Sequence, residues 1–143
     1  MQVSLILDEQ VPELVSRMYP HFVRAAEYTY GRFEVEDILD FIAQPGHHLW
    51  IAFDGEEVKG ITVTRFMQYP RVKCLDMVFC GGDDGMEWKD PMMKMLQHWG
   101  YDNQCSKIES SGRVGWSKIF KNDGYKMLWQ VYELPVASSG LGA

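Results

Sequence analysis

One glycine-rich loop combines residues that suit phosphate binding with residues that oppose it. The run CGGDDGMEW places three glycines and three carboxylates at the start of a predicted helix: Gly81, Gly82, Gly85, Asp83, Asp84 and Glu87. Glycines let a backbone approach a ligand closely, and free N–H groups at a helix start attract phosphate. Carboxylates oppose a polyanion there, since two unit charges about 4 Å apart repel by roughly 1 kcal/mol even in water. The same acidic side chains are also good helix caps, which is the structural alternative.

A second anion-binding feature is Arg113, which lies between two glycines in the run SGRVGW. A guanidinium in such a loop can grip a phosphate, or a carboxylate of a partner protein, because its planar fork binds two oxygens at once. The structural alternative is an arginine that ties its loop to Asp76 or Glu109. The sequence leaves both interpretations open.

Two carboxylates on predicted strands are candidates for acid–base chemistry. Asp76 lies in the apolar run VKCLDMVF, where burial would raise its pKa unless a cation such as Lys73 or Lys107 paired with it. Glu109 lies on the strand before the Arg113 loop, and its ordinary interpretation is a solvated strand residue. Either carboxylate could serve as a general base, which accepts a proton from an attacking nucleophile.

The periodicity of apolar residues and the turn residues predict the elements that position these groups. Helices are predicted over residues 11–30, 34–43, 86–100 and 116–122, and strands over residues 49–53, 58–66, 72–80, around Ile108, and 125–135. Helices come first, antiparallel strands second and crossover helices last, which predicts an α+β fold: a mixed, mostly antiparallel twisted sheet with helices on both faces. We expect a single domain over residues 1–135 and a flexible tail over residues 136–143.

Composition excludes several classes of function. The chain has 143 residues, 46% of them hydrophobic, which suits one domain with a real core, and its net charge of −6 argues against nucleic-acid binding. No signal peptide, spanning helix or basic membrane stripe is predicted, so we expect a cytoplasmic protein. Three cysteines without ligand spacing predict free thiols, and the His47–His48 pair lacks a third ligand, so no metal site is expected.

The order of elements over residues 49–133 resembles the GNAT superfamily of acyl-CoA-dependent N-acyltransferases. In that family the last helix ends in a Leu-Tyr-x-x-x-Gly-Phe pattern, which Ile119, Phe120, Gly124 and Tyr125 match in register. The loop over residues 112–116 more narrowly resembles GNAT-like proteins of tailed bacteriophages, some of which belong to virus particles.

The resemblance implies a binding site for acetyl-CoA and also where this chain departs from the family. The pantetheine arm is expected where strands separate after Phe79, and the pyrophosphate at Gly81, Gly82 and Gly85, with Arg113 as a further contact. Phe120 stands where the family's usual acid is a tyrosine, and Arg113 and Trp116 stand where the family has Asn and Ala. A phenyl ring has no proton to donate. A substitute acid could be Tyr125 or Cys105, and a base could be Asp76, Glu109 or His98.

Two functions follow from these observations. In the first, the transferase site is degenerate and the protein has a binding role in phage particle assembly or structure, with a phage or host protein as partner and with homo-oligomers possible. In the second, the protein is an acetyl-CoA-dependent N-acetyltransferase with a divergent pyrophosphate loop. The departures from the family pattern favour the first function.

Overall fold

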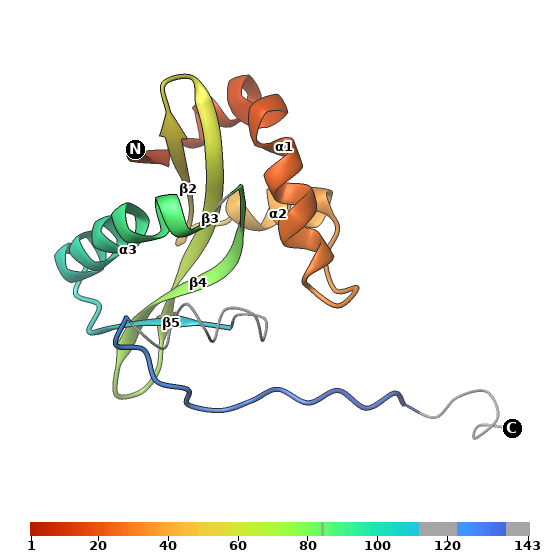
Figure 1. The fold of residues 1–143 in the computed structure, drawn as a ribbon. Coiled ribbons are helices and arrows are strands. Elements are labelled where there is room, and N and C mark those ends of the chain that lie inside the picture. Colours follow the sequence, from red (N-terminus) through yellow and green to blue (C-terminus); the bar gives the residue numbers. More distant parts are fainter. Residues whose placement is uncertain (84, 112–122, 137–143) are drawn as a thin grey trace, which may run out of the picture. The chain divides into compact units, whose positions relative to one another are not determined.

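The computed structural model describes residues 1–83, 85–111 and 123–136. The chain divides into two compact units, Met1–Ser111 and Gly112–Ala143. The elements described, all in the first unit, are β1 (Gln2–Ile6), the 3-10 turn η1 (Asp8–Gln10), α1 (Val11–Glu27), α2 (Val35–Ile42), β2 (His47–Asp54), β3 (Glu57–Gln68), β4 (Lys73–Gly82), α3 (Gly85–Asp102) and β5 (Lys107–Ser110). The predicted α+β fold class is confirmed (Figure 1).

Five strands form one mixed sheet in the order β1-β2-β3-β4-β5. The first four strands pair antiparallel, and β5 pairs parallel to β4 after the α3 crossover. The Asp54-Gly55 turn joins β2 to β3, and Gly55 has a φ of 61°, a value that glycine adopts without steric cost. The sequence predicted this hairpin and its turn.

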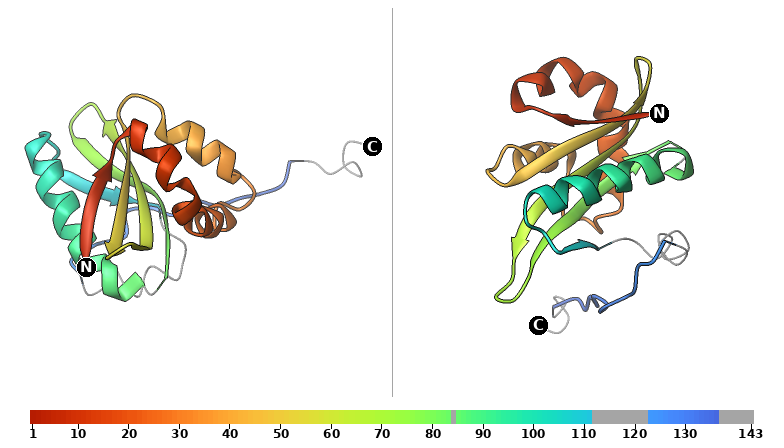
Figure 2. Two further views of the ribbon diagram at one scale, coloured as in Figure 1. Left: turned by 90° about the horizontal axis from the view of Figure 1, so that it is seen from above. Right: turned by 90° about the vertical axis from the view of Figure 1, so that its left-hand side faces the viewer.

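Helices cover both faces of the sheet. Helices α1 and α2 lie on one face and α3 lies on the other (Figure 2, left). Side chains alternate between the two faces, as a pleated strand requires. On β2, Leu49 and Ile51 contact the α1 side, whereas Trp50 and Ala52 contact the α3 side.

Two elements near the amino end differ from the sequence prediction. β1 was not predicted, because a five-residue edge strand is too short to give a clear alternating pattern. α1 continues through Pro20 as one helix, although a bend or division was expected there. Its amphipathic face, which includes the fully buried Met18 and Phe22, packs against the sheet and offsets the hydrogen bond that proline removes.

The second unit is described over residues 123–136. Gly124 has a φ of 84°, a value that glycine adopts without steric cost. The predicted helix over residues 116–122, which this glycine was expected to end, lies outside the described residues. The predicted strand over residues 125–135 is wrong, because the structure assigns no regular element to these residues. Alternating apolar residues favour a strand, but a strand also needs a neighbour to complete its hydrogen bonds. Seven large apolar side chains of the segment are between 59% and 90% exposed: Met127, Leu128, Trp129, Val131, Tyr132, Leu134 and Val136.

Candidate functional site

Among the described residues, β5 pairs with only part of β4. The pairs run from Cys74 with Lys107 to Met77 with Ser110, and no described strand pairs with the next five residues of β4 on that side. On the other side, Val63 of β3 lies opposite Phe79 and Thr64 lies opposite Met77, so Val78 is an extra, bulged residue. A bulge bends its strand and increases its twist. The bulge therefore falls directly after the last described β4–β5 pair, close to the separation expected after Phe79.

Close packing accounts for the glycines at the end of β4. A Cβ atom on Gly81 would lie 2.2 Å from the backbone oxygen of His21 in α1. A Cβ atom on Gly82 would lie 2.7 Å from the backbone oxygen of Lys59 and 2.9 Å from the ring of Trp88. The side-chain space of both glycines is thus filled by the protein itself, and only their backbone groups are available to a ligand.

An arginine that the sequence analysis did not select lies beside the start of α3. Arg24 of α1 donates from Nη1 to Asp83 Oδ1 at 2.7 Å and to the backbone oxygen of Gly82 at 2.8 Å. Both side chains of this ion pair are about half exposed. Arg24 therefore balances the charge of Asp83, one of the three carboxylates expected to repel a pyrophosphate.

Four polar residues form a row across the sheet on its α1–α2 face. The backbone register aligns His47 of β2 with Arg65, Arg65 of β3 with Asp76, and Asp76 of β4 with Glu109 of β5. We call these four residues the cross-strand row. It brings together Asp76 and Glu109, the two strand carboxylates selected from the sequence, one residue before the end of the β4–β5 pairing.

Hydrogen bonds fix the two carboxylates of the row. Asp76 is 8% exposed and accepts from Nε of Arg65 at 3.0 Å, so its partner is Arg65 and not the expected Lys73 or Lys107. Burial raises the pKa of Asp76, and Arg65 opposes that shift. Glu109 is half-buried and accepts from the hydroxyl of Tyr69 at 2.6 Å, which raises the pKa of Tyr69 to about 12. Tyr69 therefore keeps its proton at neutral pH.

The other site residues predicted from the sequence lie in different parts of the molecule. The Phe79 side chain is buried against Phe41 of α2, with the ring centres 5.4 Å apart, so only the backbone of Phe79 can face a ligand. Gly85 begins α3. Tyr125 lies in the second unit. Four residues, namely Asp84, Arg113, Trp116 and Phe120, lie outside the described residues.

The alternative acid and base are not part of the row. Cys105 packs with the α3-side cluster, and burial raises the pKa of its thiol. His98 is an exposed residue of α3, on the face of the sheet opposite to Asp76.

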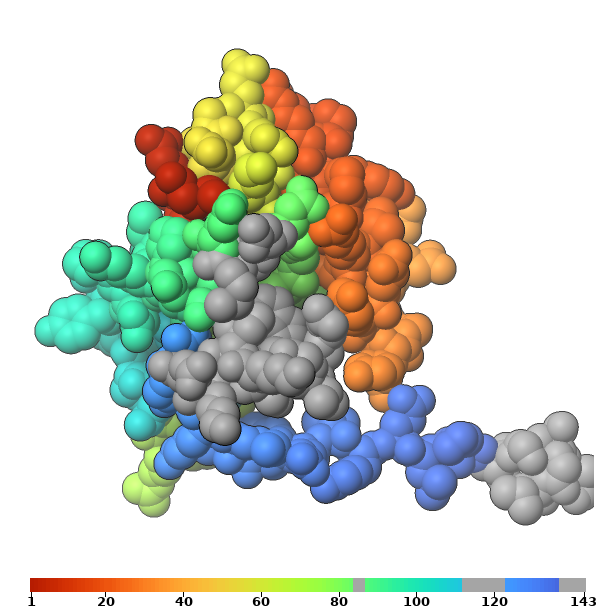
Figure 3. Space-filling model, in the orientation of Figure 1, coloured from red at the N-terminus to blue at the C-terminus, as the bar shows by residue number. Residues whose placement is uncertain are grey.

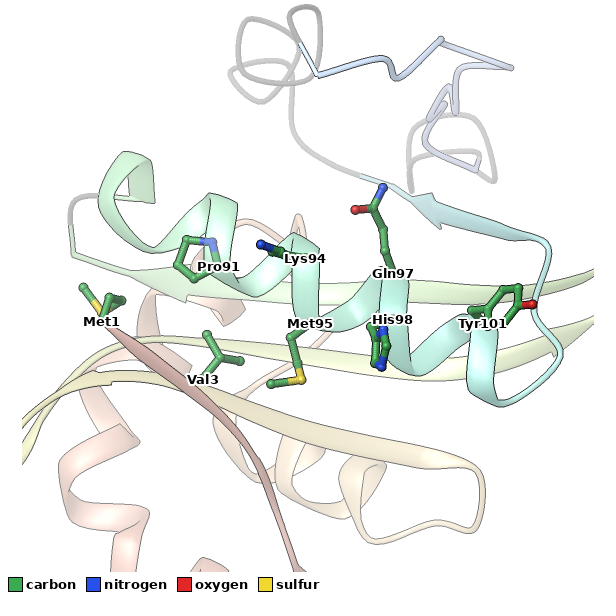
Figure 4. A pocket seen from close by; sticks show the side chains of 8 residues that line it. All are labelled: Met1, Val3, Pro91, Lys94, Met95, Gln97, His98 and Tyr101. Carbon is green, nitrogen blue, oxygen red and sulfur yellow. The ribbon is translucent and has the colours of Figure 1, made fainter.

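His98 instead lines an open groove of about 650 Å³ between α3 and the start of β1 (Figure 4). On the surface, the first residues of the chain (red) lie next to α3 (green) (Figure 3). The lining is mostly apolar and includes Met1, Val3, Met95 and Tyr101. The groove thus belongs to the outer edge of the sheet and lies away from the row.

Membrane-spanning helices and metal-binding clusters are both absent from the described residues. Among them, no helix has the length and hydropathy needed to cross a bilayer. Residues 1–83, 85–111 and 123–136 also contain no group of three or more His, Cys, Asp or Glu side chains arranged to hold a metal ion.

Several solved structures with the same fold are described as acetyltransferases, one of them as a GNAT family member. A probable acetyltransferase superposes with a TM-score of 0.72 at 13% identity, covering 96% of this chain and 99% of its own. A GNAT family acetyltransferase of Staphylococcus aureus gives a TM-score of 0.67 at 8% identity, covering 94% and 98%. A ribosomal-protein-alanine N-acetyltransferase of Brucella melitensis gives 0.66 at 12% identity, covering 95% and 100%. Neither a protein-family model nor a curated protein sequence matches the chain.

These likenesses define the fold as that of the GNAT acetyltransferases. At such low identity they establish the fold alone, so the chemistry must be argued from the residues of this chain. Three residues absent from the sequence analysis enter that argument: Arg24, Arg65 and Tyr69. The alternation of β3 could have placed Arg65 opposite Asp76, whereas no local signal pairs Arg24 with a residue 59 positions later.

Proposed function

We propose that this protein is an acetyl-CoA-dependent N-acetyltransferase. The observation that carries the proposal is the bulge of β4 at Val78, directly after the last described β4–β5 pair, Met77 with Ser110. Backbone groups of β4 beyond that point have no described partner on the β5 side, and an extended chain that carries amides can hydrogen-bond to such an edge as an added strand would. The pantetheine arm of an acyl coenzyme is a chain of this kind.

The start of α3 supports the same proposal. The free N–H groups and positive dipole end of this helix favour an anion, and α3 begins three residues after β4 ends. Arg24 supplies a half-exposed cation beside that helix end. We propose that Arg24 contacts the pyrophosphate of the coenzyme, because the acidic loop itself contains no basic residue. Asp83 then competes with the phosphates for the same guanidinium.

The cross-strand row supplies the acid–base groups. Transfer joins the acceptor nitrogen to the acetyl carbonyl carbon and breaks the bond from that carbon to sulfur, while the nitrogen loses one proton and the sulfur gains one. We assign Glu109 to receive the proton of the amine, because Tyr69 occupies only one of its oxygens, whereas Asp76 is buried and held by Arg65. Tyr125 remains the sequence candidate for the acid that protonates the sulfur.

Calorimetric titration with acetyl-CoA, together with release of the coenzyme thiol in the presence of amines, tests the proposal. We expect binding, with Arg24→Ala weakening it about 5-fold and Asp83→Asn strengthening it by a similar factor, since one unit charge about 4 Å away contributes roughly 1 kcal/mol. The matched control is Arg17→Ala, which removes the same charge from an exposed position two turns earlier on α1. An absence of binding at millimolar acetyl-CoA would end the proposal.

A protein-binding role in a phage particle is the second candidate function. The observation that favours it is the exposed apolar segment over residues 127–136, which supplies contact surface for a partner or for another copy of the chain. Light scattering over a range of protein concentrations tests self-association. If the segment binds another copy, Trp129→Ser lowers the mass of the assembled species, and a monomer at all concentrations contradicts that use of the segment.

A further inference from the structure

Two side chains of the cross-strand row, Arg65 and Glu109, have hydrogen-bonding groups without a described partner. Arg65 donates to Asp76 through Nε, and no described residue accepts from its two Nη groups. A guanidinium carries five donors, so most of its capacity remains. Glu109 accepts from Tyr69 at Oε1, and no described residue donates to its second oxygen. The Arg65 side chain is 34% exposed and Glu109 is half-buried, so neither side chain is fully enclosed by the described residues.

The charges of the row are separated along the sheet. The nitrogen-bearing side chains, His47 and Arg65, lie on β2 and β3, and the carboxylates, Asp76 and Glu109, lie on β4 and β5. Arg65 on β3 and Glu109 on β5 lie two strand spacings apart, about 9.6 Å between backbones, so side chains that lean toward each other can hold the two ends of one small molecule. The Arg65 side chain is 34% exposed, which leaves its outer edge open to a carboxylate or phosphate.

The phenyl ring of Phe41 borders the Arg65 end of the row. The guanidinium carbon of Arg65 lies 5.7 Å from the centre of the Phe41 ring, and the His47 ring packs edge-on against the same phenyl ring at 4.5 Å. These contacts hold both side chains in place. A preorganised guanidinium loses less freedom when it binds a ligand, which favours a specific site over a casual surface contact.

We propose that the cross-strand row binds the acceptor, and that the acceptor is a small zwitterion whose anionic group contacts Arg65 and whose amine contacts Glu109. The inference rests on the proposed acetyltransferase function, because the row crosses β4 and β5 one residue before the last described pair of these strands. An amine held at Glu109 is therefore held next to the edge assigned to the thioester. The bound ammonium loses one proton to solvent, which frees its lone pair; on transfer it loses a second proton to Glu109, while the sulfur gains one. The acetylated nitrogen is neutral and no longer attracted to Glu109, which favours release of the product.

Direct binding without coenzyme tests this substrate class. The probes are γ-aminobutyrate, butylamine and butyrate, which share a four-carbon chain and differ in their charged groups, with glycine and β-alanine as shorter zwitterions. Titrations are followed by the nitrogen-correlated NMR signals of the Arg65 side chain and of the backbone of the row. We expect at least one zwitterion to bind at least 10-fold more tightly than both butylamine and butyrate.

Variants separate the two ends of the site. Glu109→Gln keeps an acceptor for Tyr69 and should abolish the preference for a zwitterion over butyrate. The double variant Arg65→Gln with Asp76→Asn removes both charges of the ion pair, leaves no buried charge unpaired, and should abolish the preference for a zwitterion over butylamine. Lys94→Gln is the control, because it removes a positive charge from an exposed position on α3, across the sheet.

The outcomes distinguish this inference from the proposed function. If acetyl-CoA binds and no zwitterion is preferred over its single-charge analogues, the substrate class is wrong and the transferase proposal stands. If a zwitterion is preferred and both row variants lose the preference, the row is a zwitterion site. If that result occurs without any binding of acetyl-CoA, the zwitterion is not an acceptor and the inference fails together with the transferase proposal.

Discussion

Replacing Gly81 with alanine tests whether the end of β4 is held by packing against α1. The added Cβ atom would lie 2.2 Å from the backbone oxygen of His21 and 3.2 Å from the backbone nitrogen of Ala25. These are backbone atoms of one helix, so the clash cannot be relieved by rotating a side chain. Either α1 or β4 must move by about 1 Å, and overpacking of this kind costs roughly 1 to 3 kcal/mol, occasionally more.

Thermal unfolding in the absence of ligand measures the effect. For a chain of this size, 1 kcal/mol shifts Tm by about 3 to 6 °C, so Gly81→Ala should lower Tm by roughly 5 to 15 °C. The matched control is Gly100→Ala in α3, where the nearest heavy atom would be an ordinary 3.7 Å away. That change should stabilise the protein by about 0.5 to 1 kcal/mol, because alanine is the better helix former. An unchanged Tm for Gly81→Ala would refute the packing argument and return this glycine to a role in ligand approach.

Three further predictions concern the α3 side of the sheet. The pKa of His48 is lowered to about 4 by burial and by the neighbouring His47, so the unfolded chain binds more protons between about pH 4 and 6.5. Stability should therefore fall as pH drops through that range, by about 1 to 2 kcal/mol after allowing for the ring's partial solvation, and urea unfolding of His48→Gln should show a smaller fall. Thr64→Val should destabilise by about 1 to 3 kcal/mol in the same assay, because the indole of Trp50 donates to Thr64 Oγ1 at 3.0 Å and would lose its partner; an effect below 0.5 kcal/mol, on the scale of a neutral surface change, would contradict this. Burial raises the pKa of Cys80 to about 11, so this thiol should react about a hundred-fold more slowly with alkylating reagents at pH 8 than a free cysteine, as mass spectrometry of the labelled peptide can show.

Local patterns were sufficient to predict most of the fold. The α1 and α2 stripes, the Asp54-Gly55 hairpin and the α3 crossover each carry their signal within about fifteen residues, and together they imply the mixed sheet. The failures have a common cause. Whether β1 and the residues after Gly124 form strands depends on a distant segment that completes their backbone hydrogen bonds. The local sequence does not show whether such a partner is present.

The candidate site was predictable only in part. Asp76 could be selected because a carboxylate on an apolar strand is unusual, and Glu109 because it lies on the strand before the Arg113 loop. Their alignment depends on the parallel register of β4 and β5, two strands that α3 separates in the sequence, and no local signal sets that register. Arg24 and Asp83 meet only because α1 packs on the end of β4. The loop sequence alone therefore overstates the negative charge at the start of α3, because the compensating cation, Arg24, comes from α1.

The most direct test of the central claim is the change in backbone amide NMR signals on titration with acetyl-CoA. If the edge of β4 beyond the bulge seats the thioester arm, the largest changes within residues 1–83 and 85–111 should fall on residues 78–82 and on the first turn of α3. The changes should saturate with one ligand per chain. Signals that stay unchanged at millimolar acetyl-CoA, or changes centred on the groove between α3 and β1, would contradict the account.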